Sequence, residues 1–114
     1  LTPELVKNKY KLYGSNIDEL LNSNDIKTPN YVKIDVDGIE HLILKGALNL
    51  LNNNQLKEIL IELNPDYKDQ YDMVDDILTT KGFKKISEMN SKLFFNKDHK
   101  LKENEKVNVI FQRK

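Results

Sequence analysis

Cysteine is absent from this chain of 114 residues. Its absence excludes disulfides, thiolate metal sites and cysteine nucleophiles together. The chain also lacks an apolar run long enough to cross a bilayer, and its amino end does not have the pattern of a signal peptide. We therefore expect a cytoplasmic protein that makes no contact with a membrane.

An excess of either charge is lacking too, because 18 basic residues balance 18 acidic ones. This balance predicts neither a nucleic-acid partner nor a polybasic membrane anchor. Glycine is scarce. The four glycines are too scattered to form the G-x-G-x-x-G loop of a dinucleotide site, and they stand at Gly14, Gly38, Gly46 and Gly82.

The length is that of one ordinary domain, so we assign residues 1–114 to a single unit without an internal repeat. The first residue is Leu1 rather than Met. We therefore expect that the chain is a piece of a longer polypeptide.

Apolar periodicity predicts an α/β order of elements. The predicted elements are a short helix ending near 22, capped by Ser15 or Asn16, a strand at 31–37, a helix at 39–51, a strand at 58–63, a helix at 67–81, and strands at 83–89 and 107–112. Asp66 and Gly82 are the expected caps of the second long helix. Residues 93–95 are either a further strand or a hydrophobic plug. Two strand–helix–strand steps predict parallel strands with crossover helices, and the last two strands predict a closing antiparallel hairpin.

An acidic cluster stands where the first strand gives way to its helix, and ligands bind at this edge of open α/β sheets. Asp35 ends a buried strand, where a carboxylate is costly unless it has a partner or a task. Lys33 is the structural alternative, since it points to the same face and could pair with Asp35. For Asp37 and Glu40 the structural alternative is a capping box at the helix start.

Two known kinds of site can be compared with this cluster. An EF-hand loop fails, because it would need a carboxylate at Lys33 and a glutamate at Leu44. The Asp-x-Asp-Gly run also resembles the first motif of haloacid-dehalogenase-type phosphatases, with Asp35 as nucleophile and Asp37 as acid/base beside magnesium. Ile39 and the lack of a suitable downstream acidic pair oppose that alternative.

The full run matches another family better. Lys33-Ile-Asp35-Val-Asp37-Gly38-Ile-Glu40, followed by Leu44-Lys-Gly46-Ala47, resembles the signature of FkbM-type methyltransferases. That family usually reads Lys-Ile-Asp-Val-Glu-Gly-x-Glu and then Leu-x-Gly-Ala, so Asp37 replaces the usual Glu. The resemblance extends over nearly the whole chain, through the segments at 16–21, 59–62, 81–83 and 108–111.

This resemblance implies methyl transfer from S-adenosylmethionine to a hydroxyl of a sugar or another small molecule. It also implies a partial Rossmann-like methyltransferase sheet, in which the first three strands are absent. The chain would be the carboxyl-terminal portion of the fold and would lack the Gly-rich cofactor-binding half. We therefore expect this piece alone to be inactive, with most of the S-adenosylmethionine site lying upstream.

The same resemblance suggests a division of roles among the polar residues. Asp35 would be the base or would orient the acceptor, with Glu62 beside it and Lys33 holding Asp35 ionised. The residues expected to contact the small-molecule acceptor are Asp37, Glu40 and Asn64. For Asn64 a turn-forming role before Pro65 is the alternative. A divalent metal between Asp35 and Glu62 is an alternative, but no histidine or further ligand stands at a convincing spacing, so we predict no metal site. His41 and His99 are expected at the surface.

The missing strands have a further consequence for residues 32–36 (Val32 to Val36). In the complete fold another strand would cover this one, so here it would be left at an edge. If these residues fold alone, we expect a homodimer or strand swapping through this edge. A non-catalytic α/β interaction module remains a third alternative to the two enzymes.

Overall fold

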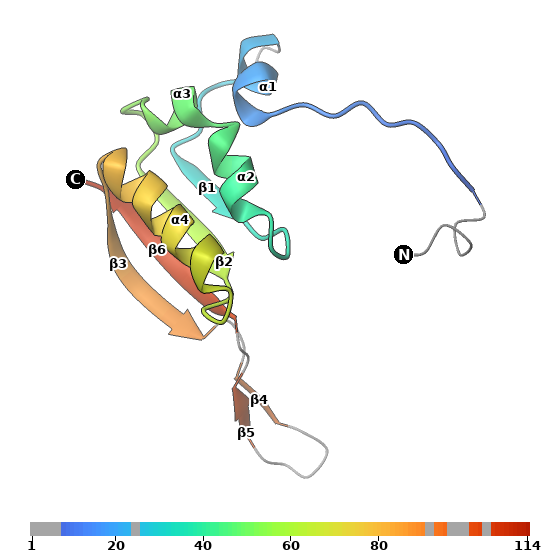
Figure 1. The fold of residues 1–114 in the computed structure, drawn as a ribbon. Helices are drawn as coiled ribbons and strands as arrows, with labels where there is room; N and C mark the ends of the chain where they lie inside the picture. Colours follow the sequence, from blue (N-terminus) through green and yellow to red (C-terminus); the bar gives the residue numbers. More distant parts are fainter. Residues whose placement is uncertain (1–7, 24–25, 91–92, 96–100, 104–105) are drawn as a thin grey trace.

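The computed structural model describes residues 8–23, 26–90, 93–95, 101–103 and 106–114. Four strands form the main sheet in the order β1-β2-β6-β3 (Figure 1). Their bounds are β1 Tyr31–Ile34, β2 Glu58–Leu63, β6 Val107–Arg113 and β3 Phe83–Asn90. The fold is therefore mixed α/β, as the sequence predicts.

The strand pairing agrees with the prediction in part, although β3 runs in the same direction as β2, because both are antiparallel to β6. β1 and β2 run parallel, whereas β6 lies between β2 and β3 and is antiparallel to both. The closing antiparallel pair is thus confirmed, and parallel pairing is limited to β1 and β2. This arrangement is compatible with a partial Rossmann-like sheet.

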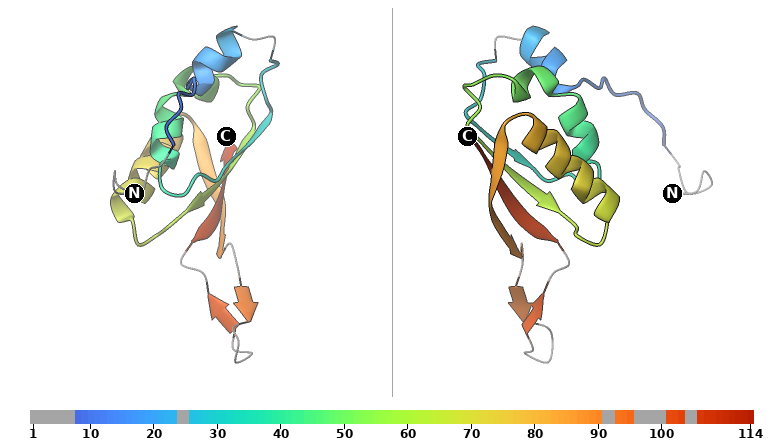
Figure 2. Two further views of the ribbon diagram at one scale, coloured as in Figure 1. Left: turned by 90° about the vertical axis from the view of Figure 1, so that its right-hand side faces the viewer. Right: turned by 60° about the vertical axis from the view of Figure 1, so that its left-hand side comes forward.

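Helices cover one face of this sheet, as both views in Figure 2 show. They are α2 Glu40–Lys45 and α4 Lys68–Thr80, with α3 Leu48–Leu51 and α1 Ile17–Ser23 at one end. Alternate residues of β2 are buried against the helices, because successive side chains in a strand point to opposite faces. The core between the layers includes Ile59, Ile61, Leu44, Val74, Leu78 and Phe111.

The predicted helix at 39–51 is wrong as one element, since it divides into α2 and α3 at Gly46 and Ala47. A Cβ on Gly46 would lie 2.6 Å from the Cβ of Asn16, so only glycine allows this close approach. Asn16 is confirmed as the cap of α1, because its side-chain oxygen accepts from the amide of Glu19 at 2.8 Å. Asp18 then accepts from two backbone amides of α3.

The predicted N-cap of the second long helix is also wrong. α4 begins at Lys68, and its N-cap position is Tyr67, which has no side-chain capping bond. The amide of Asp66 donates to the side chain of Asn64 at 2.9 Å, which is the turn-forming role given above as the alternative for Asn64. At the other end, Lys81 is the C-cap and Gly82 follows with a φ of 90°.

Residues Leu93–Phe95 form strand β4, which pairs antiparallel with β5, Leu101–Glu103. They are therefore a strand rather than a plug. This pair projects beyond the main sheet (Figure 1). The position predicted for His99 lies outside the described residues. In the described part of the chain, no helix is both long and apolar enough to span a membrane.

Candidate functional site

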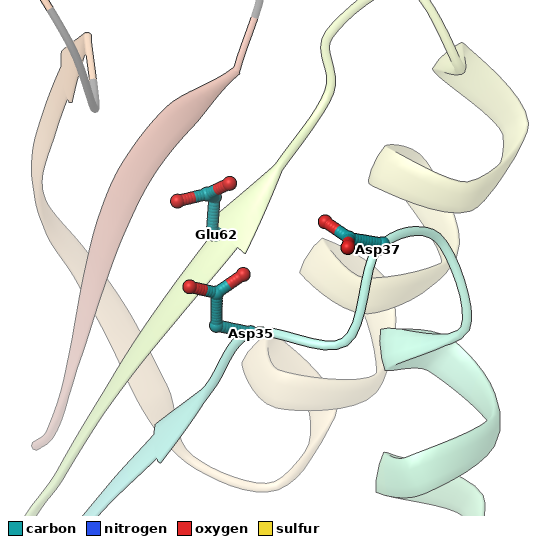
Figure 3. A group of neighbouring side chains, drawn as sticks. All are labelled: Asp35, Asp37 and Glu62. Carbon is teal, nitrogen blue, oxygen red and sulfur yellow. The ribbon is translucent and has the colours of Figure 1, made fainter.

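Three carboxylates meet at the carboxyl ends of β1 and β2. Asp35 directly follows β1, Glu62 is the next-to-last residue of β2, and Asp37 lies on the loop that leads to α2 (Figure 3). Because the two strands are parallel and paired from Tyr31 to Ile34, their ends lie side by side. One oxygen of each carboxylate lies within 4.8 Å of the other two. The structure thus brings Asp35 and Glu62 together.

The loop after β1 turns sharply. Asp37 has a φ of 56° and Gly38 a φ of 111°, both in the left-handed region that favours glycine and tolerates Asp or Asn. The carboxylate of Glu40 is buried beneath the loop and accepts from the amides of Val36 and Gly38, the closest at 3.0 Å. Glu40 therefore holds the backbone of the loop that positions Asp37 at the site.

The capping-box prediction for Asp37 is wrong. The N-cap of α2 is Ile39, which has no side-chain capping bond. Glu40 does fold back on amides, but they belong to the loop rather than to the cap residue. The cause is the left-handed turn at Asp37, which directs its carboxylate toward Glu62 instead of the helix (Figure 3).

Lys106 is the cation of this site. Its Nζ donates to Oδ1 of Asp37 at 2.6 Å and lies 3.6 Å from Oε1 of Glu62. The hydrogen bond to Asp37 raises the pKa of Lys106 above its ordinary value, so the ammonium stays charged at neutral pH. Sequence reasoning missed this residue. The signal was its place next to β6, because Val107 pairs with Leu63 and so puts Lys106 beside the end of β2.

Lys33 does not join this group of charged residues. It is exposed on β1, and no carboxylate of the described residues comes within ion-pair distance of it. The role predicted for Lys33 stays a prediction, while Lys106 provides the positive charge that the geometry shows.

A cavity of about 310 Å³ adjoins the carboxylates. This volume is at the lower end of the range for small-molecule sites. Four predicted residues line it, namely Asp37, Glu40, Glu62 and Asn64, and they are joined by Lys106, Gly38, Leu63, Tyr67, Gln70 and Tyr71. Asp35 is not part of the lining, but its carboxylate reaches two residues that are.

Asp35, Asp37 and Glu62 are also the described residues whose spacing would suit a divalent cation bound by oxygen ligands. The ammonium of Lys106 already provides a positive charge beside two of them. A base acting on a hydroxyl, or an acceptor of hydroxyl hydrogen bonds, needs no more than these carboxylates.

Comparisons with known proteins agree on one kind of enzyme. Residues 14–85 match the family described as the methyltransferase FkbM domain. Over 52 residues the chain is 40% identical to the hexuronic acid methyltransferase AglP of Haloferax volcanii. That alignment covers 46% of this chain but only 22% of the archaeal protein. No solved structure matches the chain.

Proposed function

This chain belongs to the FkbM methyltransferase domain family, and we propose from that premise that it forms the acceptor side of an S-adenosylmethionine-dependent O-methyltransferase. The acceptor is a hydroxyl of a sugar or another small molecule. A sugar acceptor is favoured by the name of the archaeal relative, a hexuronic acid methyltransferase. The observation that carries the proposal is the meeting of Asp35 and Glu62 beside a polar cavity.

Asp35 is the base in this proposal. S-adenosylmethionine, when bound, supplies an electrophilic methyl group. The carboxylate of Asp35 would take the proton of the acceptor hydroxyl, which would make the hydroxyl oxygen a better nucleophile. Glu62 and Asn64 hold the acceptor by hydrogen bonds, while Lys106 keeps the neighbouring carboxylates in place.

The glycines of the described residues stand apart, at Gly14, Gly38, Gly46 and Gly82, and so provide no Gly-rich loop that would cradle the cofactor. We therefore assign the acceptor side alone to these residues. The proposal places most of the cofactor site in a preceding segment of a longer cytoplasmic protein.

A methyl-transfer assay tests this function. The full-length protein is incubated with S-adenosylmethionine carrying a labelled methyl group and with a panel of sugars, and labelled methyl ethers are expected. Release of phosphate from a generic ester, dependent on magnesium and without methyl transfer, would contradict the proposal and support the Asp-x-Asp-Gly phosphatase instead. Absence of both activities would favour the non-catalytic module.

The second part of the proposal concerns residues 1–114 folding alone, which we expect to form a homodimer. β1 is the first strand in the sheet order, so its outer edge has no partner strand in the described residues. An edge of this kind presents free backbone donors and acceptors that pair readily with another chain. Tyr31 is 72% exposed on this strand and adds apolar surface to the edge.

A further inference from the structure

The cavity has an aromatic wall at the start of α4. Tyr67 and Tyr71 line it, together with Gln70. The amide of Tyr71 donates to the carbonyl of Tyr67 at 3.0 Å, so the two tyrosines stand one helical turn apart. Residues spaced by four lie on the same face of a helix. The two aromatic side chains therefore lie along one side of the cavity.

Tyr71 is held in this wall by the protein. Its hydroxyl accepts a hydrogen bond from Nζ of Lys85 at 3.1 Å, and the same ammonium lies 3.6 Å from a carboxylate oxygen of Glu88. The partly buried ring also packs against the hydrophobic core. A side chain that is already fixed loses little further freedom when a ligand packs on it, which favours binding.

Tyr67 is the exposed part of the wall. It is 59% exposed and lies at the edge of the cavity. A ligand that packs on this ring gains stability from the apolar area that it removes from water. The face of an aromatic ring carries partial negative charge, so it also attracts the weakly positive hydrogens of C–H bonds. Tyr67 is therefore suited to a ligand with an apolar C–H face.

Polar groups lie around the rest of the cavity. Glu62 and Asn64 come from the end of β2, and Gln70 reaches the loop after β1, since a Cβ on Gly38 would lie 3.9 Å from its side-chain oxygen. The side-chain amides of Asn64 and Gln70 can donate, and the carboxylate of Glu62 can accept. The cavity therefore combines an aromatic wall with several groups that bind hydroxyls.

A pyranose ring has both of these complementary surfaces, because its hydroxyls project from the rim while its axial C–H bonds form apolar faces. A flat phenol would stack on the tyrosines but would leave most of the polar groups without a partner, which is unfavourable. We propose that Tyr67 and Tyr71 bind the C–H face of a sugar ring, while the polar lining groups bind its hydroxyls. This inference rests on the proposed function, which places the acceptor in this cavity.

Titration of the isotope-labelled protein, followed by the amide NMR signals of Gly38, Asn64 and Gln70, tests the aromatic wall. The probes are methyl β-glucoside and glucuronate, which share the same ring faces, and sorbitol, which carries its hydroxyls on an open chain. We expect both ring sugars to bind more tightly than sorbitol. Tyr67→Ala should weaken both ring sugars by the same factor, at least about tenfold, since the C–H face returns to water.

Two further variants separate the ring from other effects. Tyr67→Phe keeps the aromatic face and should bind the ring sugars within about twofold of the wild type. Tyr13→Ala is the matched control, because Tyr13 is an exposed tyrosine that does not line the cavity, and it should change nothing.

The outcomes distinguish this inference from the proposed function. Wild-type affinity in Tyr67→Ala, an equal loss in Tyr67→Phe, or equal binding of sorbitol and methyl β-glucoside would overturn the inference alone. Reporters that respond to no sugar at all would overturn it together with the acceptor cavity of the proposed function.

Discussion

Asp37 combines a strained backbone with an ion pair. Its φ of 56° is one that L-residues seldom adopt, and its carboxylate bonds Lys106 at 2.6 Å. The spacing of Asp37 and Glu40 suggests a capping box, but spacing alone does not report backbone conformation. Sequence reasoning could therefore place Asp37 near the helix start and not foresee where its carboxylate points.

Two substitutions of Asp37 separate the contribution of the backbone from that of the charge. Asp37→Asn keeps a residue that tolerates the left-handed conformation, whereas Asp37→Ala does not. Both lose the ion pair with Lys106. We expect Asp37→Ala to be less stable than Asp37→Asn by about 1 kcal/mol in urea denaturation. Equal stabilities would show that the left-handed turn at this residue is not maintained.

Lys106 makes the stability of the folded protein depend on pH in the alkaline range. Its hydrogen bond to Asp37 raises its pKa above the ordinary value of 10.5. A cation with a raised pKa in the folded state adds stability that is fully present below the unfolded pKa and disappears as pH rises through the folded pKa. The difference in Tm between wild type and Lys106→Gln should thus stay constant at neutral pH and shrink above about pH 10.5. A difference that shrinks already near neutral pH would contradict this.

At the residue scale the sequence predicted much of the site. Asp35, Glu62 and Asn64 were predicted to lie together because they stand at the carboxyl ends of two apolar strands, and these ends must meet if the strands are parallel. Lys106 was missed because its position depends on the pairing of β6 with β2, which joins residues far apart in the chain. Their catalytic and binding roles remain predictions.

At the scale of elements, the alternation of apolar residues gave the most accurate prediction of bounds. β2 was predicted with its observed bounds, because every second residue is apolar and buried. β1 ends at Ile34, earlier than predicted, since the chain turns away from the sheet into the loop at Asp37. The break between α2 and α3 was missed, because it depends on Asn16, which is distant in the sequence, rather than on local periodicity.

Gly46 tests that explanation of the break. A methyl group at this position would lie 2.6 Å from Cβ of Asn16, so Gly46→Ala should destabilise the fold by about 1–3 kcal/mol in urea denaturation. The matched control is Gly14→Ala, because a Cβ there would meet no atom within 4 Å. If both variants were equally stable, α1 would not pack at Gly46 as described.

At the scale of the whole molecule, the sequence predicted the α/β class and the antiparallel closing pair but not the strand order. The insertion of β6 between β2 and β3 depends on long-range pairing, which local periodicity does not encode. The same order leaves β1 at one edge and the carboxylates at its end. The candidate site therefore lies next to the edge of the sheet that β1 forms.

The edge proposal predicts self-association that weakens when charge is added to β1. Sedimentation of residues 1–114 alone, over a range of concentrations, should reveal a dimer, with the dissociation constant raised at least about tenfold in Tyr31→Lys, since lysine on an edge strand opposes pairing. Tyr67→Lys is the control, as Tyr67 is similarly exposed but stands outside the sheet, before α4. A wild-type protein that is monomeric at every concentration would contradict the proposal.

Methyl transfer by an Asp35→Asn variant of the full-length protein tests the central claim most directly. Asparagine keeps the shape of the side chain but cannot take the hydroxyl proton, so kcat should fall by at least about 100-fold. Asp76→Asn, at an exposed carboxylate of α4, should leave the rate unchanged. Methyl transfer at the wild-type rate by Asp35→Asn would contradict the assignment of Asp35 as the base.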